Sequence, residues 1–135
     1  MSRFLRCIRK DRKGIGAVEF ALIAPLLILL IVGIAQMGIL YFAHAGLRNL
    51  VAEGARFASI SPRPTDAAIK ARINRGGFGL ASDKLGAPTV TYGNTNGNEW
   101  ADIRLTYTVN LDFIFWSSGN FPITETRRVF IYSTT

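Results

Sequence analysis

Residues 20–43 read FALIAPLLILLIVGIAQMGILYFA, and this stretch decides the fold. It contains no Asp, Glu, Lys, Arg or His from Phe20 to Ala43. As a helix with a rise of about 1.5 Å per residue, it would extend about 36 Å. A charge-free apolar run of that length is typical of a helix that crosses a bilayer. The sequence therefore predicts one transmembrane span over about residues 20–43 and argues against a purely cytosolic enzyme.

A basic leader precedes this span. Residues 1–14 carry six basic side chains and one acid, which is +5 of the total net charge of +7. The basic residues are Arg3, Arg6, Arg9, Lys10, Arg12 and Lys13. Because Lys and Arg next to a span mark its cytoplasmic side, we expect a cytoplasmic N-terminus and an exported chain after about residue 47.

The composition gives no support for nucleic-acid binding or for catalysis. The pI near 10.2 comes mainly from the leader, and the rest of the chain has no basic stripe with interleaved aromatic residues. Cys7 and His44 are the only cysteine and the only histidine, and we expect them on opposite sides of the membrane. We therefore expect no nucleic-acid partner, no metal, no cofactor and no enzymatic activity, since neither a metal cluster nor a catalytic set is apparent.

Helical periodicity continues beyond the span. Apolar residues recur at spacings of three and four at Leu47, Leu50, Val51, Gly54, Phe57 and Ala58. The opposite face holds Arg48, Asn49, Glu53 and Arg56. We expect one long helix over residues 15–61 that ends near Ser61, because Pro62 and Pro64 push their predecessors out of helical geometry.

Residues 62–135 are expected to form a small exported α+β domain. Thr65-Asp66 can cap a short helix over about residues 66–75, with Ile69 and Ile73 as apolar contacts and Gly76-Gly77 as its end. Residues 88–93 are predicted as a strand, followed by a hairpin turn at Asn96-Gly97.

The clearest strand has apolar side chains at every second position: Ile103, Leu105, Tyr107, Val109, Leu111, Phe113 and Phe115. Such alternation indicates an antiparallel sheet with one packed face. A turn is expected at residues 117–120 and a third strand at 122–133, with Arg127-Arg128 on a solvated face. The predicted fold is α+β, with a long N-terminal helix packed on a small antiparallel sheet of about three strands.

Glu19 is the residue with the strongest functional signal. A charged side chain within a span costs about 2.5–3.5 kcal/mol at full depth, so such an acid is expected to have a partner. The chain has no basic residue between Glu19 and Arg48. If the chain were cut after Gly14, the new α-amino group of Ile15 would be a cation at the same depth. It could pair with the Glu19 of a neighbouring, axially shifted subunit.

The sequence Gly14-Ile15-Gly16-Ala17-Val18-Glu19-Phe20, followed by ALIAP, resembles the type IV prepilin cleavage motif. It is most similar to TadE-like pilins of the tight-adherence (Tad) system, and residues 51–56 also resemble that family's segment just outside the membrane. The resemblance implies that a prepilin peptidase cuts after Gly14 and that Ile15 is the mature N-terminus. It also implies that Glu19 is the assembly acid, Phe20 its aromatic companion and Pro25 the early helix proline.

The resemblance further implies a minor pilin or pseudopilin that supports surface adhesion or secretion. Such a subunit lies in the inner membrane with its C-terminal domain periplasmic or extracellular. Its partners would be the prepilin peptidase, other pilin or pseudopilin subunits and an inner-membrane assembly platform.

Three alternatives stay open at this point. A plain anchor could keep residues 1–14, with Glu19 merely at the membrane interface, and carry a periplasmic binding module. Alternatively, Ala43-His44-Ala45 could be a secretory cleavage site. Residues 113–116, four consecutive bulky apolar side chains, are expected either to pack on the helix or to form an exposed contact surface.

Overall fold

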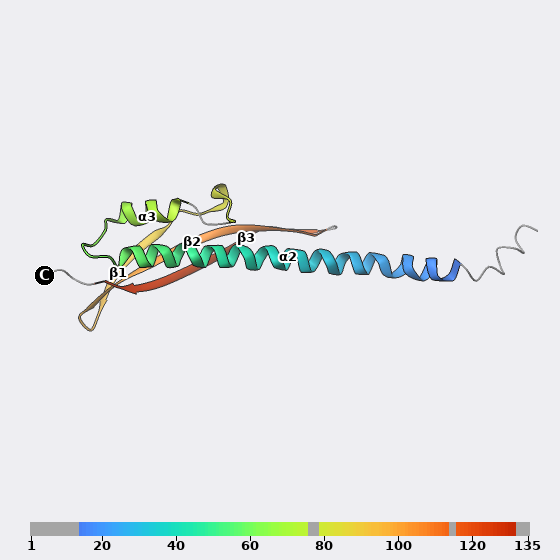
Figure 1. Cartoon of the computed structure of the whole chain (residues 1–135), viewed down its shortest axis with the longest axis horizontal. Coiled ribbons are helices and arrows are strands. Elements are labelled where there is room, and N and C mark those ends of the chain that lie inside the picture. The colour runs from blue at the N-terminus through green and yellow to red at the C-terminus, as the bar shows by residue number, and fades with distance from the viewer. Residues whose placement is uncertain (1–13, 76–78, 114–115, 132–135) are drawn as a thin grey trace, which may run out of the picture.

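The computed structural model describes residues 14–75, 79–113 and 116–131. The elements are α2 (Ile15–Ala58), α3 (Asp66–Asn74), η2 (Ser82–Lys84), β1 (Thr89–Thr95), β2 (Asn98–Phe113) and β3 (Trp116–Phe130). Figure 1 shows the sheet and α3 lying along the C-terminal half of α2, while the N-terminal half of α2 projects alone. The predicted α+β fold, a long helix packed on a three-stranded antiparallel sheet, is confirmed.

The long helix α2 runs without interruption through Pro25 and ends at Ala58, a little before the expected end near Ser61. The earlier end has a local cause in Ser59. Its backbone N–H bonds the carbonyl of Ala55 at 3.2 Å, and its hydroxyl donates to the carbonyl of Arg56 at 2.8 Å. The N–H bond to Ala55 is an ordinary helical bond, whereas the hydroxyl bond to the carbonyl of Arg56 competes with continuation of the helix.

The core lies between the C-terminal half of α2 and one face of the sheet. Leu47 of α2 and Ile103 of β2 are both 0% exposed. The buried side of α2 consists of Ala43, Leu47, Leu50, Val51, Gly54, Ala55 and Ala58. The alternation predicted for the second strand is confirmed from Ala101 to Val109, where every second residue is buried.

The short helix α3 packs beside α2. The side chain of Thr65 caps it by accepting a hydrogen bond from the backbone N–H of Ala68 at 3.3 Å. Ile69 and Ile73 are buried, as the sequence predicts. The expected end at Gly76-Gly77 lies outside the described residues.

The sheet has the order β1-β2-β3, and both neighbouring pairs are antiparallel. Asn96 and Gly97 join β1 to β2 with φ values of 54° and 81°. Positive φ at both central residues is the geometry that a two-residue hairpin turn needs, so the predicted turn is confirmed. β1 begins at Thr89 and continues to Thr95, slightly later than the expected strand over residues 88–93.

The turn expected at residues 117–120 is wrong. These residues belong to β3, where Ser117 pairs with Asp112 and Asn120 pairs with Asn110. Ser118 and Gly119 of β3 both lie opposite Leu111 of β2. Two residues against one make a β-bulge, so the Ser-Gly sequence that suggests a turn forms a bulge here. Gly119 has φ +65°, and the backbone N–H of Leu111 donates to the hydroxyl of Ser118 at 3.2 Å.

β3 therefore begins at Trp116 and ends at Phe130, instead of running over residues 122–133. Phe113 and Trp116 are register partners at the end of the hairpin, and the two residues between them lie outside the described ranges. Phe115, predicted as the last residue of the alternating strand, lies there too.

Candidate functional site

The residues expected to direct processing and assembly lie at the projecting end of α2. Gly14 is the N-cap and Ile15 the first helical residue. Ile15 and Glu19 are four residues apart and share one face of the helix. Phe20 and Pro25 follow on the same exposed segment, and Pro25 leaves the carbonyl of Ala21 without its usual helical hydrogen bond.

Glu19 has no hydrogen-bond or ion-pair partner among the described residues. The nearest cation along the described helix is Arg48, which lies about 43 Å away at the helical rise per residue. The carboxylate is exposed and its neighbours along the helix are apolar. A group in this position can bind a cation that comes from outside the described fold.

The segment around Glu19 exposes an unusually apolar surface. The exposed large side chains include Leu22, Ile23, Leu26, Leu27, Ile28, Leu30, Ile31 and Ile34. Among the described residues, α2 is the one helix long and apolar enough to cross a membrane. A continuous apolar surface of this size needs lipid or other helices around it.

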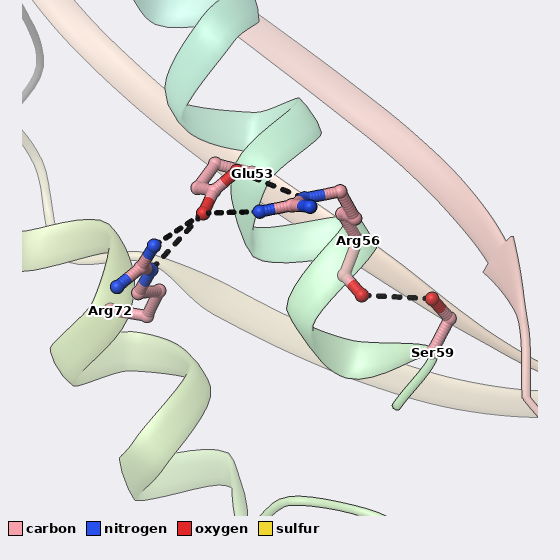
Figure 2. A network of polar contacts seen from close by, with 4 residues as sticks. All are labelled: Glu53, Arg56, Ser59 and Arg72. Atoms are coloured by element: carbon pink, nitrogen blue, oxygen red, sulfur yellow. Dashed lines mark hydrogen bonds and ion pairs between the residues drawn. The ribbon is translucent and has the colours of Figure 1, made fainter. Parts of the chain in front are cut away.

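A polar network joins α2 to α3, as Figure 2 shows. Oε1 of Glu53 accepts hydrogen bonds from Nη2 of Arg72 at 2.6 Å and from Nε of the same side chain at 3.2 Å. Arg56, one turn further along α2, donates to both carboxylate oxygens at 3.3 Å. Glu53 therefore holds two guanidinium groups and ties the short helix to the long one.

These bonds lower the pKa of Glu53, chiefly through the hydrogen bond from Arg72 and then through the one from Arg56. A carboxyl group with a lowered folded pKa stabilises the fold above its unfolded pKa, and that stability is lost as the pH falls through the folded value. Asp102 acts in the same direction, because the hydrogen bond from Arg128 lowers its pKa.

We expect the thermal midpoint of the detergent-solubilised chain to fall as the pH drops below about 4.5, the ordinary pKa of Glu53. In Glu53→Gln this fall should be smaller, with Asp102 responsible for part of the remainder. The measurement is the unfolding midpoint by circular dichroism across this pH range. Asp83→Asn, a change at an exposed acid in η2, is the control. An unchanged pH profile in Glu53→Gln would contradict the role assigned to the network.

A second set of contacts joins α2 to the sheet. Nε2 of His44 lies 2.8 Å from Oε1 of Glu125, and Nε of Arg48 lies 3.2 Å from the same oxygen. Closer to the N-terminus, the side-chain amide of Gln36 donates to the carbonyl of Asp112. His44, expected on the opposite side of the membrane from Cys7, thus contacts the sheet domain.

Arg128 is paired within the chain, whereas a purely solvated face was expected at Arg127-Arg128. Its guanidinium makes two bonds of 2.8 Å to the carboxylate of Asp102 and lies 3.7 Å from the ring centroid of Trp100. The pair is cross-strand, since Asp102 and Arg128 are register partners.

Sequence reasoning missed the contacts of Arg72 and Glu125. Both make ion pairs with residues of α2 that are distant in sequence, so no local spacing connects the partners. The sequence holds part of the information that points to these contacts. Glu53 and Arg56 lie on the predicted polar face of the long helix, and charged residues on a face that packs beside a second helix need partners there. No group of three or more His, Cys, Asp or Glu that could hold a metal occurs within the described part of the chain, and Cys7 lies outside it.

The fold and the exposed end of α2 define a class: a single-span membrane protein whose helix carries a small sheet domain at its far end. The model of the TadE-like protein family matches residues 14–56. This match confirms the resemblance expected from the motif around Gly14, and it relates the chain to proteins of the Tad pilus. No curated protein matches the chain. No solved structure matches it either.

The matched segment covers α2 nearly from end to end and stops before α3 and the sheet. It includes Gly14, Glu19, Pro25 and the Glu53–Arg56 pair. The TadE-like family that this segment matches is a structural, pilus-associated one, so the match relates α2 to a membrane and to other pilus components.

Proposed function

We propose that the chain is a minor pilin or pseudopilin of a Tad-type pilus assembly machine, and that it supports surface adhesion or secretion. A prepilin peptidase removes the leader after Gly14, and Ile15 becomes the mature N-terminus. The subunit stays in the inner membrane with its sheet domain outside until it joins a pilus or its base. Its function is assembly, and the part of the helix that packs against other subunits is the exposed segment from Ile15 to about Gln36.

The observation that carries this proposal is the isolated carboxylate of Glu19 on an exposed apolar helix face, four residues after Ile15. An unpaired charge within a span is unfavourable by about 2.5–3.5 kcal/mol at full depth. A cleaved neighbour would supply the missing cation as the α-amino group of its Ile15. Pairing then favours the assembled state over the free subunit, since only assembly brings the two groups together.

The architecture supports the same role. The sheet domain covers α2 only from about Gln36 onward, so the whole N-terminal part of the helix is available for packing (Figure 1). Small residues at Gly16, Gly33 and Gly38 have no atom within 4 Å of an added Cβ, which leaves room for close approach of another helix.

A Gly14→Leu variant tests the proposal against a plain anchored binding module. A Cβ at Gly14 meets no atom within 4 Å and the backbone there has φ −85°, so the fold should tolerate the change. In a strain deleted for this chain, we expect the wild-type chain to restore surface pili and Gly14→Leu to leave them absent. The readout is surface pili by electron microscopy, with membrane levels of both chains compared by immunoblot.

Pili restored equally by Gly14→Leu would favour the anchored module with an uncleaved leader. Normal pili in the strain deleted for this chain would favour the anchored module as well.

A further inference from the structure

The hairpin of β2 and β3 reaches far along α2 toward its N-terminal half (Figure 1). Its end is held there by the hydrogen bond from the side chain of Gln36 to the carbonyl of Asp112. Gln36 lies about 32 Å from Ile15 along the helix axis. The hydrocarbon core of a bilayer is about 30 Å thick. If Ile15 lies at the cytoplasmic boundary, next to the basic leader, the end of the hairpin lies at the opposite boundary.

The side chains at this end suit that position. The rings of Phe113 and Trp116 stack with centroids 5.6 Å apart. Trp116 is 64% exposed and Phe121, in the next part of β3, is 47% exposed. We call Phe113, Trp116 and Phe121 the aromatic tip.

The aromatic tip is continuous with the exposed apolar surface of α2, which needs lipid or other helices around it. The apolar side of α2 leads directly to Gln36, where the tip is attached. Polar groups at the same end satisfy one another, since the hydroxyl of Ser117 donates to the carboxylate of Asp112 at 2.6 Å. A Trp side chain beside hydrogen-bonded polar groups is typical of the zone between lipid headgroups and acyl chains, and Phe side chains are found on the apolar face of segments that lie in that zone.

We propose that the aromatic tip binds the headgroup–acyl boundary of the outer leaflet of the membrane that α2 spans. The sheet domain then has two attachments to the membrane, the helix and the tip. The lipid-facing span runs from about Ile15 to Gln36, nearer the N-terminus than the expected span over residues 20–43. This inference rests on the membrane location of the helix and holds whether or not the chain assembles into a pilus.

The two tryptophans of the chain provide a test with an internal control. Trp116 lies in the tip, whereas Trp100 is near the opposite end of β2, about 40 Å along the strand from Phe113. Trp100→Phe leaves Trp116 as the single fluorophore, and Trp116→Phe leaves Trp100. Each full chain is reconstituted into vesicles of phosphatidylethanolamine and phosphatidylglycerol, with and without lipids brominated near the headgroup end of the acyl chain.

We expect the brominated lipid to quench Trp116 about twofold or more, and to leave Trp100 nearly unquenched. A third variant, Trp100→Phe/Trp116→Phe/Leu30→Trp, places a single fluorophore inside the span and checks insertion. It should be quenched best by lipids brominated near the bilayer centre. The wild-type chain, with both tryptophans, should show intermediate quenching, which guards against a folding defect in any one variant.

Two results would overturn the inference. In the first, Leu30→Trp is quenched while Trp116 behaves as Trp100 does and is open to acrylamide in the aqueous phase. In the second, Trp116 is shielded from both brominated lipid and acrylamide at high protein-to-lipid ratios, and it becomes open to acrylamide but not to the brominated lipid when the ratio is lowered. That result would mean that a second copy of the chain covers the tip.

Discussion

Glu19→Ala is expected to leave cleavage after Gly14 intact and to lower incorporation of the subunit into pili by at least about tenfold. The cut needs the leader and the Gly14–Ile15 bond, which this change does not alter. Assembly loses the carboxylate that would neutralise a neighbour's Ile15 amine. Removing one partner of an ion pair in a low-dielectric environment costs about 3–5 kcal/mol, which is more than a tenfold effect on an equilibrium.

The measurement is the amount of the chain in sheared pili relative to the amount in membranes, by quantitative immunoblot. Glu19→Asp keeps the charge and should recover part of the incorporation, whereas Glu19→Gln should behave as Glu19→Ala does. Asp83→Ala removes an exposed carboxylate from the sheet domain and should incorporate normally. Normal piliation in Glu19→Ala would show that this carboxylate has no role in assembly.

Gly54→Leu is expected to separate α3 from α2 and to lower the unfolding midpoint by several degrees. A Cβ at Gly54 would lie 2.7 Å from Cδ1 and 2.8 Å from Cγ1 of Ile73, which is itself buried. Excess side-chain volume in a packed core costs about 1–3 kcal/mol, and a Leu adds more atoms at the same point. The loss should exceed the gain in helix propensity of about 1 kcal/mol from removing a glycine.

Thermal unfolding of the detergent-solubilised chain measures this effect. Gly38→Leu is the matched control because it makes the same change in the same helix at a position with no atom within 4 Å of an added Cβ. Its midpoint should be unchanged or higher. Equal midpoints for the two variants would contradict the close packing of the helices at Gly54.

The parts of the fold that could be predicted from the sequence are those with local causes. The charge-free run after Phe20 and the three-to-four spacing from Leu47 define a helix without tertiary information. The alternation from Ile103 to Val109 and the Asn96-Gly97 turn likewise define a β-hairpin without tertiary information. In each case the signal and the structure it predicts lie within a few residues of one another.

The course of β3 was not predictable because the same residues suit two local structures. Ser117-Ser118-Gly119-Asn120 has a turn-forming composition, yet in the structure the strand pairing with β2 overrides it and absorbs the extra residue as a bulge. Pairing across the sheet is a long-range effect, and short windows of sequence do not contain it.

The same reason explains the missed ion pairs. Glu53 with Arg72 and His44 with Glu125 become neighbours only after α3 and the sheet pack on α2. By contrast, the placement of Gly14, Ile15 and Glu19 at the start of one helix follows from their own segment. Their roles in cleavage and assembly stay predictions until they are measured.

The most direct test of the central claim is the mass of the mature N-terminus. The chain is extracted from membranes of cells with and without their prepilin peptidase, and its N-terminal peptide is identified by mass spectrometry. We predict a start at Ile15 that depends on the peptidase, with the full leader retained when the enzyme is absent. A leader retained in both strains, or a start at Gly46, would contradict the account, because neither chain would present a free amine at Ile15 to a neighbour's Glu19.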